Sequence, residues 1–492
     1  MKRMHAEKYI WAAIAAVFCV LASAGAAVYA KTRETVQADA YAALILVLAA
    51  VYLAYVFAAV LWTDPRIPQA NDNGKAGSRL LLSAIIISGL AARIYAGLAI
   101  AGYPTDMTCW TAWSQTAVNG GLFNVYENST FLDYPPGYLY ILYLLGLLGN
   151  KIGLETFSPA YNLMLKMPSI IADMAMVLIL FRIGSRKINS QTGIVAAMLY
   201  AANPLILLDS AAWGQIDAIL VLAVVGYLFA LYKNRITMAS VIFAIGLLIK
   251  PQMLFFGPVL AVVFIKYVAR NGIIKGAKVF FAGFISAAAV FTAVVIPFAL
   301  GKEFFWILGK YMGAIESYNY ITLNSANIYG MLGLNWVPTE AIRLGIPLSV
   351  WGMMGLSFAV IAYFVLAFLN KRSSDIFILT ACLMTGIYVL GLKMHERYIV
   401  PVIALLLIAY IYDKKSSLLS LFGIISAASF ANVAQVLAIV HIPPHDILFR
   451  IASGTITAGH LVMLAICIKA TIDSRKVISD GISDGDIRSE TV

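Results

Sequence analysis

Long apolar runs recur along the whole chain, and they constrain the fold more than any other feature of the sequence. The runs are roughly 17 to 24 residues long, and a helix needs about 20 residues to cross a bilayer. Hydrophobic residues make up 62% of the chain and charged residues only 12%, far from the balance of a soluble domain. Membrane β-strands would alternate in segments of about ten residues, which this sequence does not do. The sequence therefore predicts an all-α polytopic membrane protein.

About fourteen transmembrane helices are predicted, which places both termini on the same side of the membrane. The predicted spans are residues 9–30, 40–62, 80–102, 164–183, 192–209, 216–232, 236–249, 252–267, 278–300, 346–369, 375–392, 396–412, 417–440 and 448–470. With this count, the basic loops fall on the side of the termini, namely 63–79, 181–190, 232–235, 266–278, 370–374 and 413–415. Short loops rich in Lys and Arg stay in the cytoplasm, so both termini are predicted to be cytoplasmic. The formal charge of +11 follows from these loops and does not indicate nucleic-acid binding.

The stretch 131–150, FLDYPPGYLYILYLLGLLGN, could be a fifteenth span or a helix at the membrane surface. As a span, it would move the later basic loops to the external side, against the charge pattern. It is also short for a span, and Pro135 and Pro136 suit the first turn of a helix. We therefore expect a juxtamembrane helix within one long external loop, residues 103–163, and a second external segment over residues 301–345.

The chain divides into three predicted parts. Residues 1–79 form an N-terminal transmembrane hairpin, residues 80–470 one membrane domain, and residues 471–492 a short cytoplasmic tail. The first apolar helix follows basic residues, as a signal peptide would, but its length favours an uncleaved anchor. The four cysteines show no paired spacing, so the sequence predicts neither a disulfide framework nor a zinc site.

Asp106 follows the end of the third predicted span and begins a predicted helix. A carboxylate there is favoured by the helix dipole and by free backbone N–H groups, so an N-cap is the plain interpretation. The alternative is a catalytic base that takes a proton from an incoming hydroxyl at the membrane surface. Trp110 and Trp113 share a face of this helix, where tryptophans serve as interfacial anchors or as platforms on which a sugar stacks.

Further polar residues gather at predicted external junctions. Asp133 and Tyr134 stand before two prolines, where the carboxylate could cap a turn or orient a polar substrate. Gln215 and Asp217 lie between two spans in LLDSAAWGQIDAILV, a dense group of side chains suited to capping or to sugar binding. Asn327 in NSANIYG could hydrogen-bond a sugar or cap a helix.

Basic residues on the external side oppose the overall charge pattern. Lys250 in LLIKPQMLFF, and His395 with Arg397 in GLKMHERYIVP, stand at such junctions. They could reach out to lipid headgroups, or they could bind an anionic ligand such as a lipid phosphate. Arg93 and Asp173 lie inside predicted spans, so they should face protein or water, and Arg93 is a further phosphate candidate.

The order of these motifs resembles that of the integral-membrane GT-C glycosyltransferases. The motifs are an acid after a span with A-x-W, then DYPP, IAD, GQID, KPQ, SAN and HER, between about residues 80 and 412. The likeness is closest to the dolichyl-phosphate-glucose glucosyltransferases of N-glycan assembly and their prokaryotic relatives. The protein O-mannosyltransferases are more distantly similar, and they carry a paired Asp-Glu where this chain has Asp-Met.

The resemblance implies a GT-C-type bundle that transfers a hexose, mannose or glucose, from a polyprenyl-phosphate donor to an external glycan, lipid or protein acceptor, with inversion. It implies Asp106 as general base, with phosphate contacts from His395, Arg397 and Lys250. The remaining polar candidates, Trp110, Asp133, Tyr134, Gln215, Asp217 and Asn327, would then shape the sugar or acceptor site.

No organic cofactor is predicted, and a divalent metal requirement is left open. Besides the lipid-linked sugar and its acceptor, the expected partners are membrane lipids. Two other interpretations remain at this point: a flippase or transporter of lipid-linked saccharide, whose substrate movement would survive loss of the Asp106 carboxylate, and a non-catalytic protein that binds lipid-linked sugar.

Overall fold

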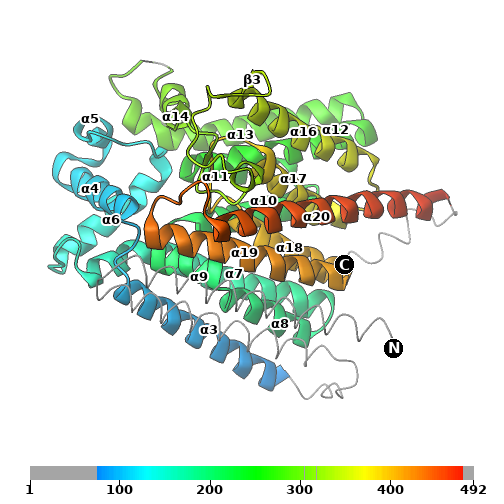
Figure 1. Ribbon diagram of the computed structural model, residues 1–492, viewed down its shortest axis with the longest axis horizontal. Coiled ribbons are helices and arrows are strands. Elements are labelled where there is room, and N and C mark those ends of the chain that lie inside the picture. Colours follow the sequence, from blue (N-terminus) through cyan, green and yellow to red (C-terminus); the bar gives the residue numbers. More distant parts are fainter. Residues whose placement is uncertain (1–74, 304, 317, 480–492) are drawn as a thin grey trace.

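A computed structural model describes residues 75–303, 305–316 and 318–479 of the chain (Figure 1). The first two predicted spans, residues 9–30 and 40–62, lie outside the described residues, as does most of the predicted tail. The last helix continues to Ser479, past the predicted end at residue 470, because no glycine or proline occurs between residues 470 and 479.

Long helices run side by side and form the body of the molecule (Figure 1). They are α3 (Lys75–Ala99), α7 (Pro159–Lys187), α8 (Ser190–Ala201), α9 (Pro204–Leu207), η3 (Leu208–Trp213), α10 (Asp217–Tyr232), α11 (Ile236–Ile249), η4 (Pro251–Phe256), α12 (Gly257–Asn271), α13 (Ile273–Ala299), α16 (Leu348–Leu369), η5 (Ser373–Asp375), α17 (Ile376–Leu390), α18 (Val400–Asp413), α19 (Ser416–Ile439) and α20 (Ile447–Ser479).

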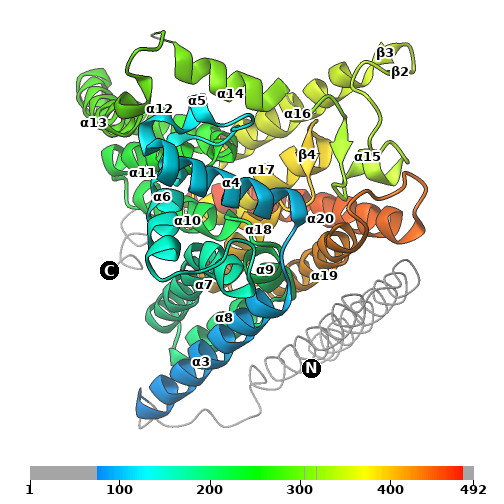
Figure 2. The same ribbon diagram turned by 90° about the vertical axis from the view of Figure 1, so that its left-hand side faces the viewer.

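Shorter elements lie at the left-hand end and along the top of the molecule in Figure 1, and the left-hand side faces the viewer in Figure 2. They are α4 (Pro104–Gly120), η2 (Leu122–Asn124), α5 (Val125–Asn128), α6 (Pro136–Lys151), α14 (Trp306–Glu316), β1 (Thr322–Leu323), α15 (Ile328–Met331), β2 (Ile342–Arg343), β3 (Ile346–Pro347) and β4 (Met394–His395). Strands β1 and β4 pair in parallel, and β2 and β3 form a small antiparallel hairpin.

The all-α polytopic fold is confirmed, but the count of fourteen spans is not. Each predicted span after residue 79 overlaps helical structure, but the predicted span 192–209 is divided by a bend between α8 and α9. Within the described residues, eight helices are long and apolar enough to cross a membrane, or nine with the bent pair Ser190–Ala201 and Pro204–Trp213. Helices α10, α11 and α18 are apolar but shorter than a full span, at 16, 14 and 14 residues.

The bundle has a packed centre and a periphery with little protein around it. In the most apolar part of α19, 89% of the residues are buried inside the protein, whereas in α13 only 11% are. Both helices contain a long, strongly apolar segment. A helix of that kind must be covered either by protein or by lipid, so α19 belongs to the protein core and α13 to the lipid-facing surface.

The charged residues within the spans face protein, as predicted. The guanidinium Nε of Arg93 on α3 lies 2.8 Å from the Asp173 carboxylate on α7, and both side chains are fully buried. Asp173 also accepts a hydrogen bond of 2.6 Å from the Ser210 hydroxyl. Because a charge in hydrocarbon is costly, this ion pair stabilises the contact between α3, α7 and η3.

The first long loop carries the predicted juxtamembrane helix. Helix α6 begins at Pro136, with Pro135 as its N-cap. The Tyr140 hydroxyl donates a hydrogen bond to the Val294 carbonyl on α13. A Cβ atom on Gly137 would lie 2.5 Å from the Leu248 carbonyl oxygen, so only glycine permits this approach to α11. Helices α4 and α6 therefore lie over the end of the bundle (Figure 2).

Candidate functional site

Asp106 lies in the first turn of α4, but it does not cap the helix, because the N-cap residue is Tyr103. Its Oδ2 atom instead accepts two hydrogen bonds of 2.6 Å, from the indole Nε1 of Trp213 and from the side-chain amide of Gln215. The carboxylate is thus held by a segment more than a hundred residues later in the chain, at the junction between η3 and α10.

A break in a membrane helix brings this segment to Asp106. Helices α8 and α9 meet at an angle of 47°, and the chain then forms one turn of π-helix that ends at Trp213. Gly214 follows with φ +91°, and a Cβ atom there would lie 2.6 Å from the Met107 sulfur. A side chain at this position would therefore be both strained and obstructed. The Trp213 ring stacks on Tyr103 at 4.4 Å.

A buried lysine, Lys166, binds the same segment. The Lys166 ammonium donates hydrogen bonds to the carbonyls of Gly97 and Ile100, at the end of α3, and to the carbonyl of Ala212 in η3. These carbonyls lie at helix ends, where they lack partners within their helices. Lys166 thereby fixes the end of η3 beside the start of the first long loop.

Arg397 joins three carboxylates at the site. Its guanidinium lies 2.6 Å from Glu396, 3.7 Å from Asp217 and 3.9 Å from Asp106. It also lies over the ring of Trp213, 5.3 Å from the ring centre. The arrangement is compatible with the planar fork of arginine, which presents donors in several directions at once.

Lys250 is engaged by Asp217 rather than free to meet a ligand. The two side chains form an ion pair of 2.7 Å, and each is 1% exposed. The Lys250 ammonium also lies 3.4 Å from Oε1, the side-chain amide oxygen of Gln215. Lys250 therefore orients Gln215 and neutralises Asp217, and through Gln215 it acts on the carboxylate of Asp106.

The Asp106 side chain is more exposed than the other carboxylates around Arg397. Its side chain is 19% exposed, whereas Asp217 and Glu396 are 1% and 3% exposed. Both of its hydrogen bonds go to Oδ2, and within the described part of the chain Oδ1 accepts none. One oxygen of Asp106 is thus anchored while the other is open to an incoming group.

Aromatic side chains hold the first long loop against this centre. The Trp110 indole donates to the backbone carbonyl of Gly214 at 3.0 Å, and the Tyr134 hydroxyl donates to the side-chain amide oxygen of Gln215 at 3.4 Å. The rings of Trp110 and Tyr134 meet edge to face at 4.7 Å. Trp110 is only 2% exposed, so its ring has no open face on which a sugar could stack. We assign it a structural role.

The charges of Asp106 and Arg397 influence the ionisation of Asp133. Burial is the main cause that raises the pKa of its carboxyl from 3.8 to about 6. The Asp106 charge raises this pKa further, and a backbone hydrogen bond and Arg397 oppose the shift. Asp133 therefore changes charge close to physiological pH, unlike an ordinary surface aspartate.

The Asp133 carboxyl yields a prediction about pH. If the ionised form orients substrate, wild-type kcat/KM should rise through a step near pH 6 that Asp133→Asn lacks. The pKa of Asp133 is higher in the folded protein than in the unfolded chain. The free energy of unfolding therefore falls as pH rises from about 4 to about 6. Asp133→Asn should therefore unfold at a higher temperature than wild type above pH 6. Kinetic and thermal-unfolding profiles of both proteins against pH check this, and identical profiles would contradict it.

The HER motif is joined to the second long loop by the β1 and β4 pair, in which Leu323 stands opposite His395. The His395 ring meets Tyr318 edge to face at 5.1 Å. Burial, helped by the charges of Arg397 and Lys250, lowers the pKa of His395 well below its usual value. The ring is therefore neutral near pH 7, and it can offer a hydrogen bond but no positive charge.

Two predicted site residues lie away from Asp106. Arg93 is occupied by its buried ion pair with Asp173 and by the carbonyls of Gly89 and Ala201. Asn327 is fully buried and caps α15, where its side chain accepts from the Gly330 N–H. Both side chains hold helices in place, and we do not include them in the site.

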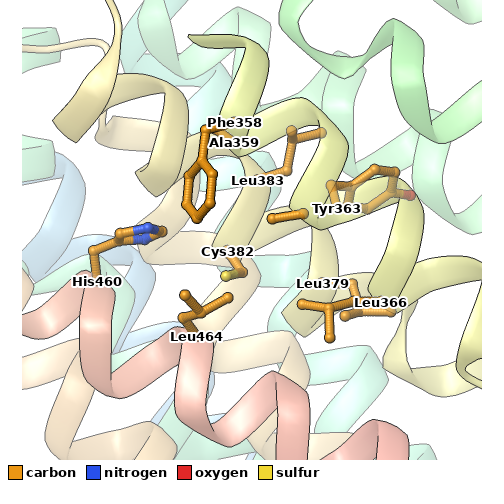
Figure 3. A pocket seen from close by; sticks show the side chains of 10 residues that line it. Phe358, Ala359, Tyr363, Leu366, Leu379, Cys382, Leu383, His460 and Leu464 are labelled. Atoms are coloured by element: carbon orange, nitrogen blue, oxygen red, sulfur yellow. The ribbon is translucent and has the colours of Figure 1, made fainter. Parts of the chain in front are cut away.

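Figure 3 shows a pocket elsewhere in the bundle, between α16, α17 and α20. His460 faces it together with Cys382 and Tyr363, amid leucine and phenylalanine side chains. Its free volume of ≈ 10 Å³ has room for no more than a water molecule. Among the residues that the structure describes, no group of three or more His, Cys, Asp or Glu side chains could hold a metal ion.

Sequence reasoning singled out Asp106, Gln215, Asp217, Lys250 and Arg397, and the structure brings all five together. Trp213 and Glu396 belong to the same junction motifs, WGQID and HER, and the sequence groups them with the chosen residues without indicating a role for either. Lys166 was not singled out. In the sequence, Lys166 can be recognised only as a basic residue near the start of a predicted span.

Comparison with known proteins found one family match. Residues 135–296, about a third of the chain, match the family model described as dolichyl-phosphate-mannose-protein mannosyltransferase. The match includes Gln215, Asp217 and Lys250, and it ends before Arg397. No curated protein matches the chain. The matched family is the one that the sequence resembles more distantly, and it belongs to the same superfamily as the closer one. This match places residues 135–296 among the GT-C membrane glycosyltransferases.

Proposed function

We propose that the protein transfers a hexose, in the first place mannose, from a polyprenyl-phosphate donor to a hydroxyl group on an external acceptor. The family model supports a lipid-linked mannose donor. The basic loops that the structure describes lie at the end of the bundle opposite Asp106, which supports an external site under the charge rule for membrane loops. Nucleotide sugars are made in the cytoplasm, so an external site needs a donor that the membrane carries.

One observation carries the proposed mechanism: the half-anchored carboxylate of Asp106. Trp213 and Gln215 fix Oδ2, and Oδ1 points to no partner within the described residues. A general base needs such an oxygen within hydrogen-bond reach of the hydroxyl that it deprotonates. Asp106 would take the acceptor proton while the acceptor oxygen attacks the anomeric carbon from the side opposite the phosphate. The bond from carbon to phosphate oxygen then breaks, and its electrons leave with the lipid phosphate.

Arg397 and His395 would meet the departing phosphate. Arg397 is 12% exposed and supplies a fixed positive charge, and neutral His395 supplies a hydrogen bond without charge. The surrounding carboxylates hold the guanidinium in one orientation before the donor arrives. Lys250 and Asp217 would position Gln215 rather than contact the phosphate, since both are nearly fully buried.

Transport of a lipid-linked saccharide is the competing function, and the bent helix pair is the feature that could favour it. Transporters place such breaks near the middle of the membrane around a substrate site. Here the π-helical turn instead ends at Trp213, beside α4, and Trp213 and the nearby Gln215 are the partners of Asp106. This position favours a reaction centre at the membrane surface.

The proposal is tested by supplying the purified protein with polyprenyl-phosphate mannose, polyprenyl-phosphate glucose, the two nucleotide sugars and a panel of glycan, lipid and peptide acceptors. We expect product and free polyprenyl phosphate to appear together with a lipid-linked donor alone. Transfer from a nucleotide sugar would contradict the proposed donor. Movement of intact donor across vesicles, with no release of polyprenyl phosphate, would show a transporter instead.

A further inference from the structure

A second, larger cavity opens at the end of the bundle opposite Asp106. Helix α10 begins with Asp217 at the site and, after 16 residues or about 24 Å, ends at Tyr232 in the cavity wall. The cavity has a volume of ≈ 520 Å³ and lies between the ends of α10 and α12 and the connection from α16 to α17. These elements meet at the right-hand end of the bundle in Figure 1. It is separate from the proposed reaction centre.

Four cations and no acid line this cavity. The cations are Lys266, Arg270, Lys371 and Arg372. Arg372 is neutralised, because its guanidinium pairs with Asp375 and Asp413.

The other three cations have no such compensation. Lys266 donates a hydrogen bond of 2.9 Å to the backbone carbonyl of Asn370, and Arg270 and Lys371 are exposed. None of the three forms an ion pair with a carboxylate in the part of the chain that the structure describes. Three uncompensated positive charges therefore surround one hollow, which favours an anionic occupant.

The deeper wall of the cavity is apolar. Val262 and Val263 of α12 face it, with Ala367 of α16 and Leu379 of α17. The same helices expose apolar side chains to the surroundings, for example Ile265, which is 47% exposed, and Val365, which is 52% exposed. A basic rim thus leads onto a surface that suits lipid chains, an arrangement that a small soluble anion does not need.

We propose that this cavity binds the phosphate headgroup of an anionic membrane lipid, with its chains along α12 and α16. Lys266, Arg270 and Lys371 would contact the phosphate. The general excess of Lys and Arg in loops at this end accounts for the sign of the charge. That excess does not explain why three cations without carboxylate partners surround one cavity that no carboxylate lines. A bound anionic lipid would explain both the positive charge and the absence of acidic lining residues.

The test is native mass spectrometry of the full-length protein in detergent, titrated with phosphatidic acid and, separately, with phosphatidylcholine. Wild type should retain phosphatidic acid in preference. Arg270→Gln with Lys371→Gln should weaken that binding about tenfold or more, because each basic residue near a membrane surface adds appreciably to the attraction of an anionic lipid. Both side chains are exposed, so the double variant is expected to fold.

A matched control removes the same charge at the same end of the bundle. Lys275 and Lys278 are exposed on α13 and do not line the cavity, so Lys275→Gln with Lys278→Gln should leave the affinity unchanged. Equal losses in both double variants, or no loss in either, would overturn the proposal. Full displacement of the lipid by inorganic phosphate at equal concentration would show a site for free phosphate and overturn the lipid assignment. Binding is measured without glycosyl transfer, so this result is independent of the proposed function.

Discussion

Asp106→Asn should lower kcat by about 10²- to 10⁴-fold, the usual contribution of a general base. The amide oxygen of asparagine can take the place of Oδ2 and accept from Trp213 and Gln215, as the carboxylate does. The amide nitrogen then stands where Oδ1 was, and it cannot take a proton. The variant therefore keeps the shape of the site and loses its base, so donor KM should change little.

Two companion variants make this result specific. Glu155→Gln removes an exposed carboxylate from the same long loop, and its kcat should equal that of wild type. Asp106→Glu keeps the charge but extends it by one methylene, so part of the activity should remain. Kinetics with the preferred lipid-linked donor provide the measurement. Turnover by Asp106→Asn at the wild-type rate would refute the assignment of the base, and a large rise in donor KM at constant kcat would indicate a binding role.

The fold could be predicted from sequence because its main signal is local. Apolar runs mark the spans, and the helices that the structure describes fall on them. The surface position of α6 followed from Pro136 and from the charge of loops far along the chain, and the structure confirms the helix. The bend after α8 was missed, since residues 192–209 read as one apolar run. Asn203 and Pro204 mark the break, where Asn203 caps α9.

The sequence indicates which residues belong to the candidate site, but not which of them contact one another. Asp106, Gln215 and Arg397 each stand out as polar residues at the ends of apolar runs. Which side chain meets which depends on the bend and on the left-handed turn at Gly214, and neither has a periodic signal. Lys250 shows the consequence. Its positive charge indicated a phosphate ligand, whereas its 1% exposure and its ion pair with Asp217 give it a supporting position.

The second large effect is expected at Arg397, where stability and donor use should both fall. Arg397→Gln leaves Asp217 and Glu396 with nearly buried charges and one cation fewer. Removing one partner of a buried ion pair typically costs about 3 to 5 kcal/mol. Arg397→Lys should retain more of the stability, because the charge remains, but an ammonium cannot reach three carboxylates and a phosphate as a planar fork does. Thermal unfolding in detergent and donor kinetics measure the two effects.

A double variant separates the two roles of Arg397. Arg397→Gln with Glu396→Gln removes the guanidinium together with its closest carboxylate, which lies at 2.6 Å. Much of the lost stability should return, since no unpaired charge remains at that contact. Donor KM should stay raised, because the proposed phosphate contact is still missing. If the double variant recovered donor use along with stability, Arg397 would be a structural residue, and the positive charge that meets the phosphate would have to come from another side chain.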